Sequence, residues 1–143
     1  MDKEHLNVQD IMIGDYIQEW REIPGVFSMP MYVSCIFDDG DLYLNFDGNE
    51  ADPWDANVKD VYDIPIDLGI LPHFGFFEEE HHLWTLKQGE WKIAVHIYTY
   101  YVSCIIFNKD ARKVLWLGDV SSIRKLQHRF YETTKKPLKL TFE

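Results

Sequence analysis

The acidic stretch from residue 38 to residue 55 is the densest group of side chains that could bind a cation. Its carboxylates are Asp38, Asp39, Asp41, Asp47, Glu50, Asp52 and Asp55. Ca²⁺ prefers several oxygen ligands from one flexible loop, which is what such a stretch could offer. The spacing differs from that of an EF-hand loop, because Asp47-Gly48 places the glycine directly after the first acid. Since Asp, Asn and Gly are also the commonest turn residues, we interpret the stretch as turns and expect no metal site.

Histidine and cysteine supply two further candidates. The run from Glu78 to His82 contains ligand types for zinc or nickel. Neighbouring side chains of a strand point to opposite faces, so His81 and His82 could converge only in a loop, and a solvated hairpin turn is the simpler interpretation. Cys104 and His96 are the residue types of a thiolate pair. Because Cys104 lies in an apolar run, where a thiol is usually inert, we assign it no catalytic role.

The chain contains no GxGxxG, GxxxxGK, GxSxG, HExxH or CxxC motif. We therefore expect no cofactor and assign no catalytic residue. The leading interpretation is a non-enzymatic interaction or accessory module. A small metal-dependent hydrolase that uses His96 or the acidic stretch is an alternative, because scattered residues can converge in a fold without a local signature.

An alternating pattern near the middle of the second half predicts a strand with one exposed face. In the predicted strand from Trp91 to Tyr101, apolar residues at odd positions alternate with Lys92, Ala94 and later even-numbered residues. His96, Tyr98 and Tyr100 fall on the exposed face. Tyrosine is enriched at interface anchors, so these residues form a candidate interaction surface for a protein partner or for self-association.

Charge bears on the class of partner. The formal net charge of −10 argues against direct binding to the nucleic-acid backbone, which requires Lys and Arg. Residues 1–100 hold 20 acidic and 5 basic side chains, whereas residues 101–143 hold 4 and 9. A second alternative follows from this distribution: an acidic mimic that antagonises nucleic-acid binding by occupying a DNA-binding protein.

The sequence also predicts a compartment. Its first ten residues are polar and charged, unlike a secretory signal, and its apolar runs are far shorter than the roughly 20 residues of a membrane span. Cys35 and Cys104 lie in apolar runs, which fits reduced thiols. We expect a cytoplasmic protein that does not contact a membrane.

The elements predict an α+β fold of mostly antiparallel strands in two modules, residues 1–64 and residues 65–143, packed as one unit. In the first module, strands at 16–20, 31–37, 42–46 and 58–64 separated by loops at 22–30 and 47–55 predict a small SH3-like barrel or curled sheet. In the second module, a weak helix at 66–74 precedes a β meander over 74–117, a helix from about residue 121 to Pro137 and a strand-like tail at 138–142.

Several segments, in this order, resemble a family of small uncharacterised proteins common in Bacteroides-like gut bacteria. They are Ile13-Gly-Asp-Tyr-Ile17, Leu42-Tyr-Leu-Asn-Phe-Asp-Gly-Asn-Glu50 with Pro53-Trp54, Ile64-Pro-Ile66 before Gly75-Phe76, and Ile123-Arg-Lys-Leu-Gln127 with Phe130-Tyr131. The resemblance implies an N-terminal SH3-like β module, a short helix, a β meander and a closing helix. It implies no activity, cofactor or catalytic residue. The chain departs from the family in a longer loop at 22–30 and in Gly69 and Pro72, which weaken the connecting helix.

Overall fold

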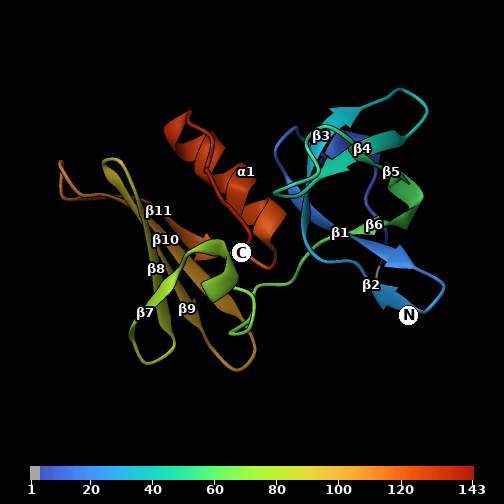
Figure 1. The fold of residues 1–143 in the computed structure, drawn as a ribbon. Coiled ribbons are helices and arrows are strands. Elements are labelled where there is room, and N and C mark those ends of the chain that lie inside the picture. The colour runs from blue at the N-terminus through green and yellow to red at the C-terminus, as the bar shows by residue number, and fades with distance from the viewer. Residues whose placement is uncertain (1–3) are drawn as a thin grey trace. The chain divides into compact units, whose positions relative to one another are not determined.

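The computed structural model describes residues 4–143. The chain divides into two compact units, with the boundary between Ile64 and Pro65. Each unit contains its own antiparallel β-sheet, and the C-terminal unit also contains an α-helix (Figure 1). The α+β class, with a curled first sheet, a meander and a C-terminal helix, is therefore confirmed.

The N-terminal unit is a curled sheet with strand order β2-β1-β3-β4-β5, in which β6 also pairs with β1. The strands are β1 (Tyr16–Arg21), β2 (Val26–Phe27), β3 (Met31–Ile36), β4 (Asp41–Asn45), β5 (Trp54–Asn57) and β6 (Val61–Tyr62). Short 3₁₀ turns, η1 (Val8–Asp10) and η2 (Val58–Asp60), precede β1 and β6. Because β1 pairs with three different strands along its length, the sheet bends around its own inner face.

The core of this unit lies inside the curl. Its buried members are Leu6, Ile11, Ile17, Met31, Val33, Leu42, Leu44 and Val61. Alternation decides which side chains enter the core. In β4, Leu42 and Leu44 are buried, whereas Asp41 and Tyr43, which alternate with them, are exposed. The outer side of β4 is thus free to carry polar groups.

Three sequence predictions for this unit were wrong in detail. The expected loop over 47–55 ends in β5, and the expected strand over 58–64 is the turn η2 followed by the short β6. The loop predicted over 22–30 contains the two-residue β2. The segment Trp54-Asp-Ala-Asn57 lacks apolar alternation, and it is a strand because it pairs with β4 in a register that joins Asp41 to Asn57.

The C-terminal unit is a five-stranded meander with strand order β11-β10-β9-β8-β7. Its strands are β7 (Phe77–Glu80), β8 (Leu83–Gln88), β9 (Trp91–Ile97), β10 (Val102–Asn108) and β11 (Lys113–Asp119). The predicted strand over 91–101 ends at Ile97, because a turn closed by the Tyr98 amide donating to the Tyr101 carbonyl at 3.0 Å follows it.

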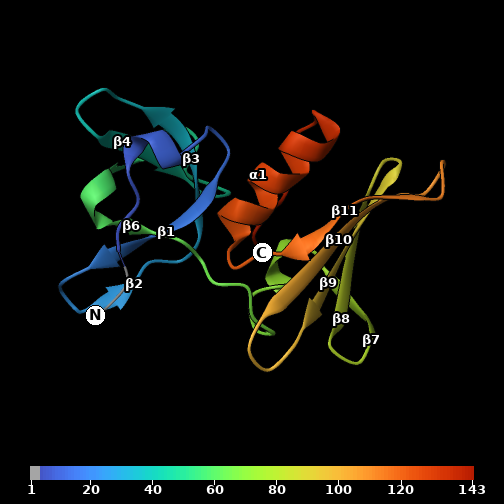
Figure 2. The same cartoon turned by 180° about the vertical axis from the view of Figure 1, so that it is seen from behind.

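The helix α1 (Ile123–Thr134) covers one face of this meander (Figures 1 and 2). Ser122 caps its first turn, since the Ser122 hydroxyl accepts from the Lys125 amide at 3.2 Å. Of the apolar residues that helical spacing predicts on one face of this helix, Ile123, Leu126 and Phe130 are fully buried, whereas Tyr131 is 43% exposed. The sheet residues on the covered face include Ile93, Val95, Cys104 and Ile106, all at 0% exposure.

Two further predictions for the C-terminal unit fail. Residues 66–74 form turns and the 3₁₀ turn η3 (Pro72–Phe74) rather than an α-helix. Asp67 caps a turn in this segment, because its carboxylate accepts from the backbone amides of Gly69 and Ile70, both at 2.9 Å. The tail over 138–142 is not a strand, although it is anchored by the edge-to-face contact of the Phe142 ring with the Phe74 ring at 5.3 Å.

Within residues 4–143, no helix combines the length and the apolar character that a bilayer crossing requires.

Candidate functional site

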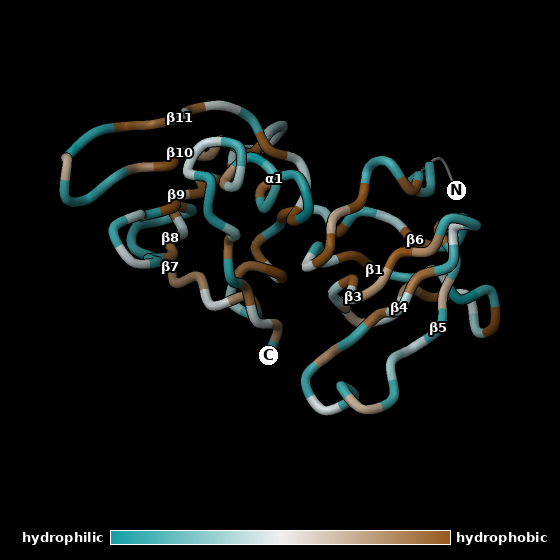
Figure 3. The backbone as a smooth tube through the Cα atoms, turned by 90° about the horizontal axis from the view of Figure 1, so that it is seen from above, coloured by the Kyte–Doolittle hydropathy of each residue, from teal (hydrophilic) through white to brown (hydrophobic). Residues whose placement is uncertain are grey.

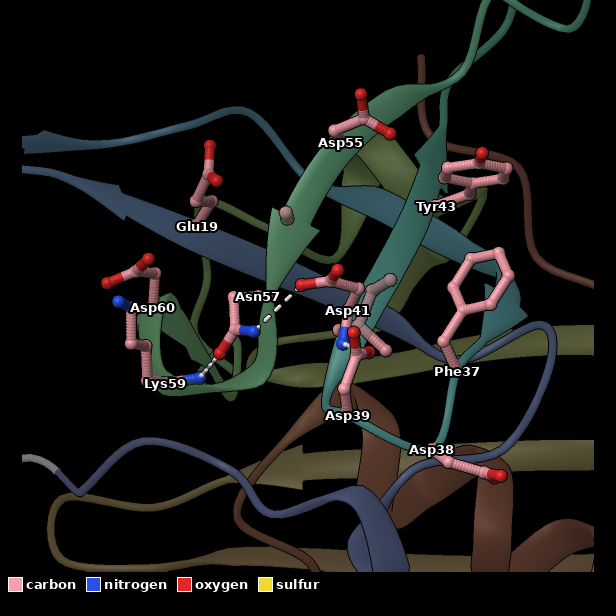
Figure 4. A pocket seen from close by; sticks show the side chains of 12 residues that line it. Glu19, Phe37, Asp38, Asp39, Asp41, Tyr43, Asp55, Asn57, Lys59 and Asp60 are labelled. Atoms are coloured by element: carbon pink, nitrogen blue, oxygen red, sulfur yellow. Dashed lines mark hydrogen bonds between the residues drawn. The ribbon is translucent and has the colours of Figure 1, made fainter.

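An open groove of about 940 Å³ lies on the outer side of β4 and β5 of the N-terminal unit (Figure 4). It is lined by Glu19, Phe37, Asp38, Asp39, Asp41, Leu42, Tyr43, Asp55, Ala56, Asn57, Lys59 and Asp60. Figure 4 shows that carboxylates from β1, the β3–β4 turn, β4, β5 and η2 surround the same space. Segments distant in sequence therefore converge here.

The groove is strongly electronegative. Its carboxylates belong to Glu19, Asp38, Asp39, Asp41, Asp55 and Asp60, and Lys59 is the one basic side chain in its lining. A concave surface lined by charges of one sign focuses the field and raises the local concentration of ligands of the opposite sign. The groove is thus suited to a cation or a cationic side chain.

The β3–β4 turn is built to bring its acids to this edge. Gly40 has a φ of 92°, a conformation that favours glycine, and its amide donates to the Phe37 carbonyl at 3.1 Å. A Cβ at Gly40 would lie 3.1 Å from Cγ1 of Val58, so the turn also packs closely against η2. The Val58 amide donates to the Gly40 carbonyl at 2.8 Å, which fixes the two segments together.

Side-chain hydrogen bonds hold part of the acidic lining in place. The Asn57 side-chain amide donates to the Asp41 carboxylate at 2.9 Å, and the Lys59 backbone amide donates to the Asn57 side-chain oxygen at 3.1 Å (Figure 4). The Asp41 amide donates to the Asp39 carboxylate at 3.0 Å. These contacts preorganise one wall of the groove.

Aromatic rings border the acids. The ring of Phe37 meets the ring of Tyr43 edge to face at 5.1 Å, and both residues keep more than a third of their surface exposed. Exposed rings beside carboxylates can pack against the alkyl stem of lysine or stack on the guanidinium of arginine. The groove therefore combines charge with an apolar wall.

Glu19 lines the groove and also connects two strands of the curled sheet. Its carboxylate accepts from the Trp54 indole N–H at 2.9 Å and forms an ion pair with Arg21 at 3.4 Å. The Arg21 guanidinium lies 4.6 Å from the centre of the Trp54 ring. Glu19 links β1 to β5, which are not neighbours in the strand order. Nothing in the sequence around Glu19 indicated this role, because its partner Trp54 is 35 residues away.

The acids of the stretch from residue 38 to residue 55 separate into two places. Asp38, Asp39, Asp41 and Asp55 line the groove, whereas Asp47, Glu50 and Asp52 are outside its lining. In the part of the chain that the structure describes, no three His, Cys, Asp or Glu side chains gather in a way that could hold a metal ion. The described residues therefore offer no ligand set for a metal-dependent hydrolase.

The predicted interaction surface lies in the other unit, at the end of β9. The rings of His96 and Tyr98 are 4.2 Å apart, and Tyr98 stacks on Tyr101 at 4.6 Å. Tyr100 lies in the turn after β9 and is 95% exposed, without a ring contact to the other two in the described structure. The structure thus brings His96 and Tyr98 together, adds Tyr101, and places Tyr100 apart from them. Its role as an interaction surface stays a prediction.

The remaining sequence candidates show no catalytic arrangement. His81 and His82 lie in the β7–β8 turn with their rings stacked 3.8 Å apart. Burial raises the pKa of the Cys104 thiol to about 12, which keeps it protonated and unreactive at neutral pH. Cys104 pairs with Val95 across the two strands, whereas His96 pairs with Ser103. Cys104 and His96 therefore point to opposite faces of the sheet.

The excess of acidic over basic side chains differs between the two units. Residues 1–64 hold 15 acidic and 3 basic side chains, whereas residues 65–143 hold 9 and 11. The acidic field therefore belongs to the unit that carries the groove.

Comparison with known proteins gives no match: no family model, no curated protein and no solved structure matches the chain. The resemblance to small Bacteroides-like proteins stays a prediction, and the function must be argued from the site itself.

Proposed function

We propose that the protein is a non-enzymatic interaction module of the cytoplasm, and that the acidic groove of its N-terminal unit binds a Lys- or Arg-bearing segment of a protein partner. The observation that carries the proposal is the combination, in one groove, of converging carboxylates with the exposed rings of Phe37 and Tyr43. A cationic side chain could place its charge among the acids and its stem or guanidinium plane against the rings.

Several features support a binding role rather than a reaction. The groove is open to solvent and wide, and its acids are spread over five segments of chain. Reactions that use acids or nucleophiles favour converging groups from which water is excluded, whereas the carboxylates of this groove line a hollow that is open to solvent.

The test compares two triple variants with the same change in charge. Asp38→Asn/Asp55→Asn/Asp60→Asn removes three carboxylates from the groove, and Asp47→Asn/Glu50→Gln/Asp52→Asn removes three from the neighbouring loop. We expect the groove variant to bind a fluorescent Lys/Arg-rich peptide about tenfold more weakly, since each exposed ion pair contributes up to about 1 kcal/mol. The loop variant should stay within about twofold of the natural protein.

Equal losses in the two variants would show that the peptide responds to net charge alone and would contradict the groove. A natural protein that binds no cationic peptide, even at low ionic strength, where such attraction is strongest, would end the proposal.

The contribution of the exposed aromatic rings has a separate test, which leaves the charge of the groove unchanged. Tyr43→Ser removes one of the two exposed rings without touching a carboxylate. Arginine stacks on aromatic faces more readily than lysine does, so the substitution should weaken an Arg-rich peptide more than a Lys-rich peptide of the same length. The same loss for both peptides would remove the ring from the proposal.

An acidic antagonist of nucleic-acid-binding proteins is a second candidate, favoured by the concentration of acidic residues in the N-terminal unit. It differs in its partner, which would be a folded DNA-binding domain rather than a flexible segment. Competition separates the two: an antagonist releases DNA from a basic DNA-binding domain, whereas a module for flexible segments binds the peptide and leaves the protein–DNA complex intact.

A further inference from the structure

One guanidinium of this chain already lies at the margin of the acidic groove. Arg21, the last residue of β1, places its guanidinium carbon 4.6 Å from the centre of the Trp54 ring. The Arg21 Nε donates to Oε1 of Glu19 at 3.4 Å, and the same oxygen accepts from the Trp54 indole N–H at 2.9 Å. Glu19 lines the groove. A carboxylate and an aromatic face thus surround a planar cation, and these are the two kinds of partner that arginine prefers.

The ring and the carboxylate are held in place by contacts that do not involve Arg21. Trp54 begins β5, a strand in which hydrophilic residues predominate (Figure 3), and it lies opposite Leu44 of β4. The Glu19 backbone amide donates to the Ser28 hydroxyl at 2.9 Å, and the Glu19 backbone carbonyl accepts from the Ser28 amide at 2.7 Å. Because both strands are fixed by their own neighbours, the site is preorganised for a cation.

Arg21 fills this site loosely. Its guanidinium carries five N–H donors, and the bond from Nε is the one hydrogen bond that it gives to the described residues. The N–O distance of 3.4 Å is long beside the roughly 2.7–2.9 Å of a charge-assisted bond. The Arg21 side chain is 39% exposed and Trp54 is 44% exposed, so both are accessible from solvent. The second carboxylate oxygen of Glu19, Oε2, accepts no hydrogen bond from residues 4–143 and is left as an acceptor.

We propose that the Glu19 carboxylate and the Trp54 ring form an arginine-binding site, and that Arg21 occupies this site until an arginine of the partner replaces it. The inference rests on the proposed function, because the incoming arginine belongs to the cationic segment that the groove attracts. Arg21 and Glu19 are two residues apart on one strand, which restricts how the Arg21 guanidinium approaches the carboxylate. An arginine of a partner has no such restriction and can bind both carboxylate oxygens with its two-pronged donor face.

The chemistry of the site selects arginine over lysine. A planar guanidinium stacks on the flat face of an indole, whereas the lysine ammonium is a compact and strongly hydrated charge. The exposed acids of the groove, such as Asp38 and Asp55, attract either cation. The Glu19–Trp54 site therefore adds a preference for arginine to the general attraction of the groove for basic segments.

The first test removes the internal occupant. Arg21→Gln should raise the affinity for a fluorescent Arg-rich peptide about fivefold or more, because the apparent affinity is reduced by the fraction of sites that Arg21 fills. Lys59→Gln removes the basic side chain of the groove lining with the same change in net charge, and it should raise the affinity by less than about twofold. Fluorescence anisotropy at one ionic strength measures both variants. Equal gains would show that net charge alone is responsible and would overturn the proposal.

A double-mutant cycle separates competition from a purely structural effect of Arg21. Glu19→Gln keeps an oxygen that can accept from the Trp54 indole N–H and removes the charge for which Arg21 and the peptide compete. This variant should bind the Arg-rich peptide about tenfold more weakly. Arg21→Gln added to Glu19→Gln should then raise the affinity by less than about twofold. A fivefold gain that persists without the Glu19 charge would contradict competition at this site.

The Trp54 ring is tested through selectivity. Trp54→Leu should reduce the preference for an Arg-rich over a Lys-rich peptide of the same length by about threefold, since an exposed ring contributes modestly to the binding of a cation. An unchanged preference would remove the ring from the site.

The outcomes distinguish this inference from the proposed function. If the triple groove variant loses affinity while Arg21→Gln behaves like Lys59→Gln, the groove binds basic segments and the arginine site is wrong. If neither the natural chain nor Arg21→Gln binds an Arg-rich peptide at low ionic strength, both proposals are wrong.

Discussion

The two sheets of this protein bury their apolar faces by different means. The N-terminal sheet curls, so Ile17, Leu44 and Val61 are all at 0% exposure within the curl, and the described part of their unit contains no α-helix. The C-terminal meander instead relies on α1, which covers one face and leaves the other half-buried or exposed. A sheet that closes on itself can keep polar groups outside, whereas a sheet covered on one side retains an apolar face and an edge.

This contrast also bears on the position of the acidic groove: the sheet that closes on itself carries the groove on its outer side, which suits a cationic ligand. The predictions below test how each sheet is closed, beginning with the largest effect.

The helix should be the main stabilising element of the meander. Phe130→Ala removes a fully buried ring that contacts Trp91, and we expect the free energy of unfolding to fall by about 3–5 kcal/mol. Urea denaturation followed by circular dichroism measures this change. Tyr131→Ala on the exposed side of the same helix is the matched control and should change stability by less than about 1 kcal/mol. Similar effects of the two substitutions would contradict a core built around α1.

The buried thiol under α1 should make stability depend on alkaline pH. Cys104 has a pKa of about 12 in the folded chain against 9.0 for the free thiol, so the folded state holds its proton where the unfolded state has lost it. Its contribution is complete below pH 9 and decreases as pH rises toward 12. Between pH 9 and pH 11 the free energy of unfolding should fall by about 2–3 kcal/mol more in the natural protein than in Cys104→Val, at about 1.4 kcal/mol per pH unit. Parallel curves for the two proteins would show that the thiol does not titrate in this way.

The hydrogen bond between Glu19 and Trp54, which connects β1 to β5, should contribute less to the free energy of unfolding than the packing of α1 does. Glu19→Ala removes the acceptor that the Trp54 indole N–H now has at 2.9 Å, and because Trp54 is 44% exposed and water can replace this partner, we expect a loss of about 0.5–1.5 kcal/mol. Thermal unfolding followed by tryptophan fluorescence measures it. Asp55→Ala, which removes an exposed carboxylate from the same groove, should stay within about 0.5 kcal/mol. If Asp55→Ala were the more destabilising of the two, Glu19 would not be the closing residue.

The smallest expected effect is a gain at the end of α1. Lys135 adopts a left-handed conformation at the helix C-cap, with a φ of 61°. Glycine adopts this conformation without a Cβ clash, so Lys135→Gly should raise the free energy of unfolding by about 0.5–1 kcal/mol. Lys136→Gly, one residue further on, is the control and should give no gain. A loss of stability in Lys135→Gly would argue against the left-handed cap.

Local patterns were sufficient for much of the fold. The alternation that begins at Trp91 predicted β9, and the stripe of Ile123, Leu126, Phe130 and Tyr131 predicted α1, because one period suffices to recognise each element. The curled first sheet and the meander followed from the spacing of strands and turns.

Elements that depend on distant partners could not be predicted. β5 has the composition of a loop and is a strand only through its pairing with β4. The sequence indicated only part of the groove. The acids at 38–41 and at 55 were recognised as candidate cation ligands, but as ligands from one loop. Glu19 and the rings of Phe37 and Tyr43 join them through the curl of the sheet, and no local pattern encodes a curl.

The burial of Cys104 has a practical consequence for observing this protein. Its thiol is protonated and inaccessible, whereas Cys35, the other free thiol, is half-buried on β3 of the N-terminal unit. A maleimide dye added under native conditions should therefore attach to Cys35 first, without any engineered cysteine. The natural chain thus provides its own selective reporter attachment point in the same unit as the acidic groove.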